Sequence, residues 1–312
     1  MSHFLLFPTN ENGVVLDEDV KDELELLANP PFDFNDFFIY SHGWWTDANR
    51  AMSEYNRFSV DFTRVVRSAP GASAAPALGT GIHWPSMLSE DSGSITNYLE
   101  ALSFYTMEKR ADSIGEHGGF LLLRTLFDQL LGRTSPFRIH LIGHSFGCKV
   151  VSSILEEIAT TGGAIPPAAS INVVLLQAAL DNNSFDAGEC YDNVVSAYPG
   201  IRFLISTSTE DAALQNAYPK AHRLANLFGT VNPAMGAAGP SAAFQARFAA
   251  KSASVAVDVG FKAVSVPKPK QLVVADLSPL HKHDVYSGDA FTGHHSDIFQ
   301  PEIYELLYGF LF

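Results

Sequence analysis

Gly143-His144-Ser145-Phe146-Gly147 is the stretch that decides the fold of this chain. It follows an apolar run at 137–142, typical of a buried strand, and it precedes residues 148–155, whose pattern favours a helix. A serine in a tight strand-to-helix turn projects its hydroxyl from the edge of a sheet, and the flanking glycines leave room for neighbouring backbone. The stretch therefore predicts a nucleophilic serine, Ser145.

Strand-like and helix-like runs alternate outward from this turn. Strands are expected near residues 4–7, 37–41, 80–84, 137–142, 171–177, 201–207 and 271–275, and helices near 54–67, 98–107, 120–131, 148–155 and 301–310. Such alternation is typical of an α/β fold with a mostly parallel central sheet and helices on both faces. We expect one domain over residues 1–312. Residues 222–263, rich in Ala, Gly and Ser, predict either a small lid over the active site or an excursion lying against the sheet.

Composition excludes several classes of partner. The chain has 312 residues, a net charge of −14 and no basic cluster, which argues against nucleic-acid binding. No apolar stretch reaches membrane-spanning length, so we expect no integral membrane association. The N-terminus lacks a secretory pattern and two cysteines make no disulfide framework, so we expect a cytoplasmic protein. The oligomeric state stays open.

A serine hydroxyl needs a histidine base, and that base needs an orienting acid. In chains with this strand-to-helix turn, the acid and then the histidine follow the serine. The candidate bases after the serine are His222, His281, His283, His294 and His295. Two of them, His294 and His295, share a Gly-rich loop after the last predicted strand. Acids that follow the strand at 201–206 are Glu210 and Asp211, and Asp181 follows the strand before it.

The negative charge that develops on an attacked carbonyl needs preorganised donors, an oxyanion hole. One expected donor is the backbone N–H of Phe146, directly after the serine. The other is the N–H of Trp44, in the loop after the strand at 37–41, where Gly43 allows close backbone approach. The remaining residues that we expect to line the substrate pocket are His42, Gly43, Trp45, Trp84 and His144.

Cofactor and metal chemistry is less favoured. The sequence lacks a Gly-x-Gly-x-x-Gly dinucleotide motif and a phosphate-cradling loop, so no cofactor is expected. His281-x-His283-Asp284 and His294-His295-x-Asp297 could together supply metal ligands, but their spacing fits no fixed metal motif. We therefore expect no metal.

Taken in order, His42-Gly43-Trp44, Gly143-His144-Ser145-Phe146-Gly147, Asp211 and His295 resemble the α/β-hydrolase superfamily. The ending His295-Ser296-Asp297 is similar to a little-characterised esterase- or lipase-like subgroup whose catalytic histidine precedes Ser-Asp. That resemblance implies His295 as base. Asp211 followed by Ala-Ala-Leu resembles the acid motif of many such enzymes, which makes it the first choice of acid.

The predicted function is a serine hydrolase that acts on a small-molecule acyl ester through an acyl-enzyme. There are two alternatives. One is an acyltransferase that uses the same serine, histidine and acid, and the other is a binding protein that has the fold without catalysis. The length of the acyl chain and the substrate stay open.

Overall fold

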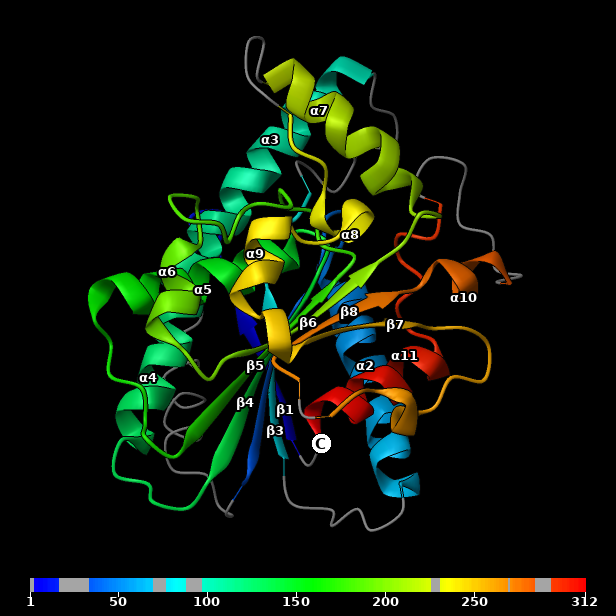
Figure 1. The fold of residues 1–312 in the computed structure, drawn as a ribbon. Coiled ribbons are helices and arrows are strands. Elements are labelled where there is room, and N and C mark those ends of the chain that lie inside the picture. The colour runs from blue at the N-terminus through cyan, green and yellow to red at the C-terminus, as the bar shows by residue number, and fades with distance from the viewer. Residues whose placement is uncertain are drawn as a thin grey trace.

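The computed structural model describes residues 3–16, 34–69, 77–87, 97–225, 231–268, 270–283 and 293–312 (Figure 1). One eight-stranded sheet forms its centre, with strand order β1-β3-β2-β4-β5-β6-β8-β7. Every pair of neighbouring strands is parallel. The strands are β1 (His3–Pro8), β2 (Asp36–Ser41), β3 (Ala77–His83), β4 (Phe137–His144), β5 (Ala169–Leu176), β6 (Arg202–Thr207), β7 (Ser252–Ala256) and β8 (Leu272–Asp276). The predicted α/β class with a parallel sheet is confirmed.

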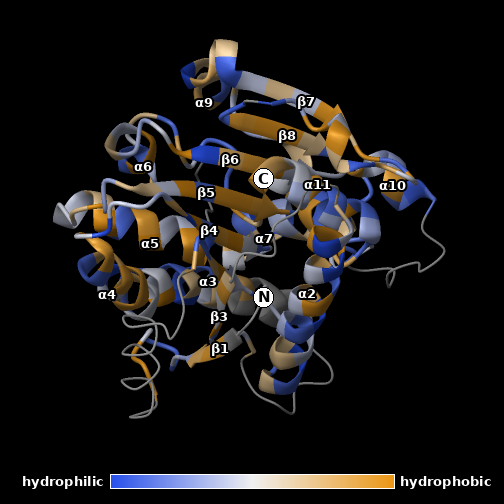
Figure 2. Cartoon of the chain, turned by 90° about the horizontal axis from the view of Figure 1, so that it is seen from below, coloured by the Kyte–Doolittle hydropathy of each residue, from blue (hydrophilic) through white to orange (hydrophobic). Residues whose placement is uncertain are grey.

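Helices cover both faces of the sheet (Figure 2). One face carries α4 (Phe120–Leu130), α5 (Gly147–Thr161) and α6 (Asp192–Ala197). The other carries α2 (Ala48–Ser68) and α11 (Pro301–Leu311), which contact each other. The remaining helical segments are α3 (Asn97–Ile114), η1 (Gly115–Gly119), η2 (Ala213–Ala217), α7 (Tyr218–Ala225), α8 (Met235–Ala238), α9 (Ala242–Arg247), η3 (Ala249–Lys251), η4 (Ala263–Ser265) and α10 (Ser278–Lys282). Among the helices in the described ranges, none is both long and apolar enough to cross a bilayer.

Side chains of the central strands alternate between two hydrophobic cores. In β2, Phe37 and Ile39 enter the core beneath α4 and α5, while Phe38 and Tyr40 enter the core beneath α2 and α11. Because successive side chains of a strand point to opposite faces, a strand that is apolar throughout must be covered on both sides. This explains why the buried strands read as continuous apolar runs rather than as alternating ones.

The range 222–263 is divided in the structure. Residues 252–256 form β7, an edge strand that sequence reasoning missed because Ser-Ala-Ser-Val-Ala has small side chains and no apolar run. Phe244 of α9 packs its ring 5.4 Å from that of Phe203 on β6. None of the described residues in 231–263 lines the cavity at Ser145. Residues 226–230 of this range lie outside the described residues.

α3 and α7 lie across the carboxyl edge of the sheet, at the top of Figure 1, and contact each other. A buried ionic cluster joins both helices to α5. Lys149 Nζ of α5 lies 3.2 Å from Glu108 Oε1 of α3, and His222 Nε2 of α7 lies 3.5 Å from the same oxygen. Burial opposes the charge on Glu108, but the close contact with His222 and the charge of Lys149 outweigh it and lower its pKa to about 2. Glu108 and Lys149 thus form a paired charge between α3 and α5, and His222 of α7 packs beside it.

Candidate active site

Ser145 occupies a sharp turn between β4 and α5. Its φ of 55° lies in the left-handed region, which costs an ordinary residue about 1–2 kcal/mol and persists only where the surroundings hold it. Backbone hydrogen bonds supply that hold: Ser145 N–H donates to Leu176 O at 3.1 Å, and Ala179 N–H donates to Ser145 O at 3.2 Å. A Cβ on Gly147 would collide with the carbonyl oxygen of Ser41 on neighbouring β2. The turn thus has the strained geometry that the Gly-x-Ser-x-Gly pattern predicts.

Three side chains that are far apart in the sequence meet at this turn. His295 Nε2 lies 2.7 Å from Ser145 Oγ, and His295 Nδ1 lies 2.7 Å from Asp211 Oδ2. Asp211 follows β6, and His295 lies in the segment between β8 and α11. Since parallel strands end at the same edge of the sheet, loops after different strands bring these groups together. The structure therefore joins serine, imidazole and carboxylate in one hydrogen-bonded chain.

The carboxylate of Asp211 is fully buried and receives donors on both oxygens. Leu214 N–H donates to Oδ1 at 3.0 Å, and Gln177 Nε2 donates to Oδ2 at 3.1 Å, the oxygen that also faces His295. The rival acids point elsewhere. Glu210 Oε1 accepts from Thr209 Oγ1, and Asp181 Oδ1 accepts from Tyr218 OH. Of the three acids that the sequence left open, only Asp211 contacts His295 in the described structure.

The other candidate histidines have partners away from Ser145. His294 Nδ1 lies 2.6 Å from Asp297 Oδ2, and its ring stacks on His281. His281 Nδ1 is 2.9 Å from Ser208 Oγ, and His283 Nε2 is 3.6 Å from Asp258 Oδ1. His222 belongs to the ionic cluster of α3 and α7. Among these five histidines, only His295 contacts Ser145 in the described residues.

The loop after β2 runs directly beside the turn. A Cβ on Gly43 would lie 2.8 Å from Ser145 Cβ, so only glycine lets the backbone approach this closely. The N–H groups of Trp44 and Phe146 donate no hydrogen bond to any described residue. Both amides therefore remain available to an oxygen near Ser145.

His42 holds the loop after β2 in place through its ring. Its ring is buried and stacks on Trp84 at 5.3 Å between centroids. Trp84 N–H donates to His42 Nε2, so the Nδ1–H is left to donate to Gly43 O at 2.8 Å. Burial lowers the pKa of His42 to about 3, which keeps the ring neutral and able to hold both bonds. His42 therefore positions the backbone of Gly43 rather than contacting a substrate.

Strand order and the turn between β4 and α5 decide the fold. The chain has the α/β-hydrolase fold. The serine turn follows a central strand of a parallel sheet, the acid and the histidine follow later strands, and a loop after an earlier neighbouring strand passes the serine.

Comparisons with known proteins are distant. No protein-family model and no curated protein sequence matches this chain. Among solved structures it is similar to the catalytic core domain of an acetyl xylan esterase from Trichoderma reesei, at 11% identity and a TM-score of 0.32 over 88% of this chain and 93% of that one. It is similar to a poly(3-hydroxybutyrate) depolymerase from Bordetella parapertussis, at 12% and 0.34 over 80% and 76%. An extracellular α/β-hydrolase from a Paenibacillus species matches at 14% and 0.18, over 47% and 43%. Likenesses this weak carry no argument about activity.

Gln177 is a member of this site that the sequence analysis missed. It stands directly after β5 with a φ of 44°, held by a hydrogen bond from its N–H to Ser206 Oγ. Its amide nitrogen donates to Asp211 Oδ2 and, at 2.9 Å, to the carbonyl of His294. One side chain thus fixes both the acid and the loop that carries His295. A glutamine at a strand end offers no motif, so its place after β5 was the only available signal.

His144 holds the same loop from the other side. Its Nε2 lies 2.8 Å from the carbonyl oxygen of His295, to which it must donate. Burial, together with the neighbouring His295, lowers the pKa of His144 to about 3. A neutral ring can donate from Nε2 and remain uncharged beside the imidazole of His295.

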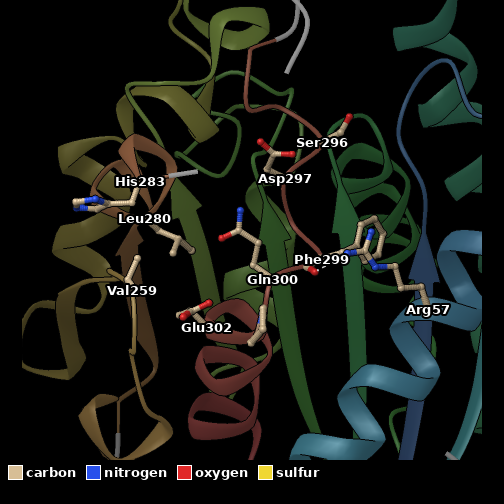
Figure 3. Close-up of a pocket in the computed structure, with 10 residues that line it drawn as sticks. Arg57, Val259, Leu280, His283, Ser296, Asp297, Phe299, Gln300 and Glu302 are labelled. Atoms are coloured by element: carbon tan, nitrogen blue, oxygen red, sulfur yellow. Dashed lines mark hydrogen bonds between the residues drawn. The ribbon is translucent and has the colours of Figure 1, made fainter. Parts of the chain in front are cut away.

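The segment 293–300 that carries His295 is also tied to α2 (Figure 3). Arg57 Nη2 donates to Phe299 O at 2.9 Å, and its guanidinium lies over the ring of Phe299. A cavity of about 650 Å³ lies between this segment, Arg57 and His283 (Figure 3). Neither Ser145 nor His295 lines this cavity, so the larger of the two cavities is not the one at Ser145.

Ser145 opens into a smaller cavity of about 140 Å³. Its lining includes Trp44, Trp45, Thr46, Arg50, Glu54, Phe104, His144, Ser145, Phe146, Ala179, Ala213, Leu214, Ala217, Tyr218, His295 and Ser296. The expected wall residues Trp45 and His144 are present. His42, Gly43 and Trp84 are not among them: Gly43 belongs to the loop that runs beside Ser145, and His42 and Trp84 pack against each other behind it. Phe104 and Tyr218 were missed because α3 and α7 reach the site only through tertiary packing.

Proposed function

We propose that this protein is a serine hydrolase that cleaves carboxylic esters. The observation that carries the proposal is the hydrogen-bonded chain from Ser145 through His295 to Asp211, at 2.7 Å for each contact, beside two unoccupied backbone N–H groups. A hydroxyl becomes a useful nucleophile when an oriented base accepts its proton.

In the proposed reaction, Ser145 Oγ attacks the acyl carbon while its proton passes to His295 Nε2. Asp211 holds the Nδ1–H of the ring and stabilises the imidazolium that forms. The carbonyl oxygen, now negative, is bound by the N–H groups of Trp44 and Phe146. His295 then gives the proton to the departing alcohol, which leaves an acyl-enzyme on Ser145. Water, deprotonated by His295, hydrolyses this ester and regenerates the enzyme.

Preorganisation is the main support for this mechanism. Asp211 is fixed by Gln177 and Leu214, and the loop of His295 is fixed by Gln177 and His144. Because these contacts exist before any substrate arrives, little reorganisation is needed during the reaction.

Replacement of the proposed nucleophile tests the function. Ser145→Ala should remove labelling by a fluorophosphonate probe and reduce kcat for 4-nitrophenyl acetate by roughly 10⁵- to 10⁶-fold. Ser68→Ala, at an exposed serine on α2, is the matched control and should keep both. Turnover that persists in Ser145→Ala would refute the mechanism. An acyl product that appears only when an acceptor alcohol is added would indicate an acyltransferase instead.

A further inference from the structure

The lining of the cavity at Ser145 is of two chemical kinds. One part is a contiguous aromatic wall: the ring of Phe104 lies 4.9 Å from Phe146, 6.0 Å from Trp44 and 5.3 Å from Tyr218. Polar and charged groups also line the cavity: Thr46 in the loop before α2, and Arg50 and Glu54 on α2.

Volume limits what the cavity can enclose. At about 140 Å³ it is well below the roughly 300–1,000 Å³ of sites for drug-sized ligands. An engineered cavity of about 150 Å³ in another protein holds one benzene, so the enclosed part of a substrate here has about six heavy atoms or fewer. An acyl group of this size is short.

Arg50 is the only arginine or lysine among the described residues that line this cavity. Its Nε donates to Glu54 Oε1 at 3.0 Å, which orients the guanidinium. The two Nη groups donate to no described residue, and the side chain is 51% exposed. A guanidinium fork with free terminal donors is suited to bidentate binding of a carboxylate.

The chemistry of the triad decides which part of a substrate meets Arg50. His295 Nε2 must protonate the leaving oxygen, so the leaving group lies toward His295 and the acyl group lies away from it. His144 connects the two residues: it contacts the carbonyl of His295, and the charge of Arg50 acts on its ring. Ser296, next to His295, also lines the cavity. We therefore assign the acyl group to the aromatic wall and the leaving group to Arg50.

The net charge of the chain bears on the role of Arg50. The chain carries −14, so its overall field repels anions. A single cation at the site of the leaving group offsets that repulsion locally. Resting on the ester hydrolase function proposed above, we propose that the site takes esters of a short acyl group with an alcohol or phenol that carries a carboxylate, and that Arg50 binds this carboxylate.

A matched pair of substrates tests the role of Arg50. 4-Acetoxybenzoate and its methyl ester have the same acyl group and scissile bond but differ in one negative charge. The measured quantity is the ratio of kcat/KM for the anion to that for the neutral ester. We expect Arg50→Met to lower this ratio about 10- to 100-fold, mainly through KM, because hydrogen bonds to charged groups contribute that much. Arg50→Lys should restore part of it.

Arg64→Met is the control, because Arg64 lies on the same helix, is 72% exposed and pairs with Asp61. It changes the net charge equally and should leave the ratio within about twofold of the wild type. Arg50→Met with Glu54→Gln removes the carboxylate that the single variant leaves unpaired, and it should show the same fall in the ratio. The proposal would be overturned if the ratio of kcat/KM values were unchanged in Arg50→Met and in Arg50→Met with Glu54→Gln while the neutral ester was still hydrolysed.

A second measurement separates this inference from the proposed function. Calorimetric binding of 4-hydroxybenzoate to Ser145→Ala requires no turnover, and it should weaken by a similar factor when Arg50→Met is added. If Ser145→Ala remained active but this binding depended on Arg50, the hydrolase mechanism would fail and the anion site would stand. The acyl half is tested by a series from acetyl to decanoyl esters. The kcat/KM should decline beyond about six heavy atoms, and a maximum at decanoyl would contradict it.

Discussion

Asp211→Asn is the substitution that examines the proposed site most directly, because it keeps the shape of the side chain and removes its charge. In the native site, Oδ2 faces the donors of His295 and Gln177, and Oδ1 faces Leu214 N–H. An amide has one oxygen and one NH₂, so it cannot satisfy all three donors. If NH₂ faces His295, the ring must switch to the tautomer that carries its proton on Nε2, which cannot accept the serine proton. If the NH₂ group faces Leu214 instead, it opposes the backbone N–H of Leu214, which is also a donor.

The magnitude follows from the charge that is lost. With an effective dielectric constant of about 20, a carboxylate and an imidazolium at the 2.7 Å contact attract each other by about 6 kcal/mol. A neutral amide oxygen keeps a minor part of this attraction. A loss of about 4–5.5 kcal/mol in the transition state corresponds to a fall in kcat of roughly 10³- to 10⁴-fold.

The assay is kcat for 4-nitrophenyl acetate, with thermal unfolding measured in parallel to verify the fold. Glu210→Gln and Asp181→Asn are the controls, because each removes one negative charge from a nearby acid that does not contact His295. Both should stay within about threefold of the wild type. A folded Asp211→Asn protein with more than a tenth of the native kcat would refute the reasoning, as would a larger loss from either control.

Three further outcomes are expected. Gly43→Ala should lower kcat at least about 100-fold, because its Cβ would lie 2.8 Å from that of the proposed nucleophile, whereas Gly132→Ala, where no atom lies within 4 Å, should be neutral in the same assay. Because the pKa of His144 is about 3 when folded against 6.5 when unfolded, its contribution to stability is complete above about pH 6.5 and is lost toward pH 3. At pH 5, preferential protonation of His144 in the unfolded chain lowers the free energy of unfolding by about 2 kcal/mol. Urea unfolding of His144→Gln should therefore depend less on acid pH than that of the wild type. Glu108→Gln should cost about 3 kcal/mol in urea unfolding, because it deprives the buried Lys149 of a carboxylate, and an unchanged midpoint would contradict the pairing.

Local patterns were enough to predict the fold class and the serine turn. Residues 137–142 read as a strand and form β4, and residues 148–155 read as a helix and lie within α5. A buried parallel strand must be apolar on both faces, and a strained turn must have glycine beside it, so both features are written in consecutive residues. β7 could not be predicted in the same way, since an edge strand of small side chains carries no apolar signal.

The sequence narrowed the candidate site residues without selecting among them. Chain order reduced the partners of Ser145 to a few acids and histidines, and it left Asp211 beside Glu210 and His295 beside His294. The two acids are adjacent in the sequence, as are the two histidines, but the side chains within each pair point in different directions. Only the path of each loop at the edge of the sheet decides which of the two side chains reaches the serine.

The sequence by itself determined that this chain is an α/β protein with a serine in a strained turn, because helix, strand and turn preferences are local. Tertiary structure alone decided which carboxylate meets which imidazole, that Gln177 and His144 hold them, and that Phe104 and Arg50 share one small cavity. These contacts join segments separated by tens of residues or more, and they depend on how parallel strands place their carboxyl ends side by side.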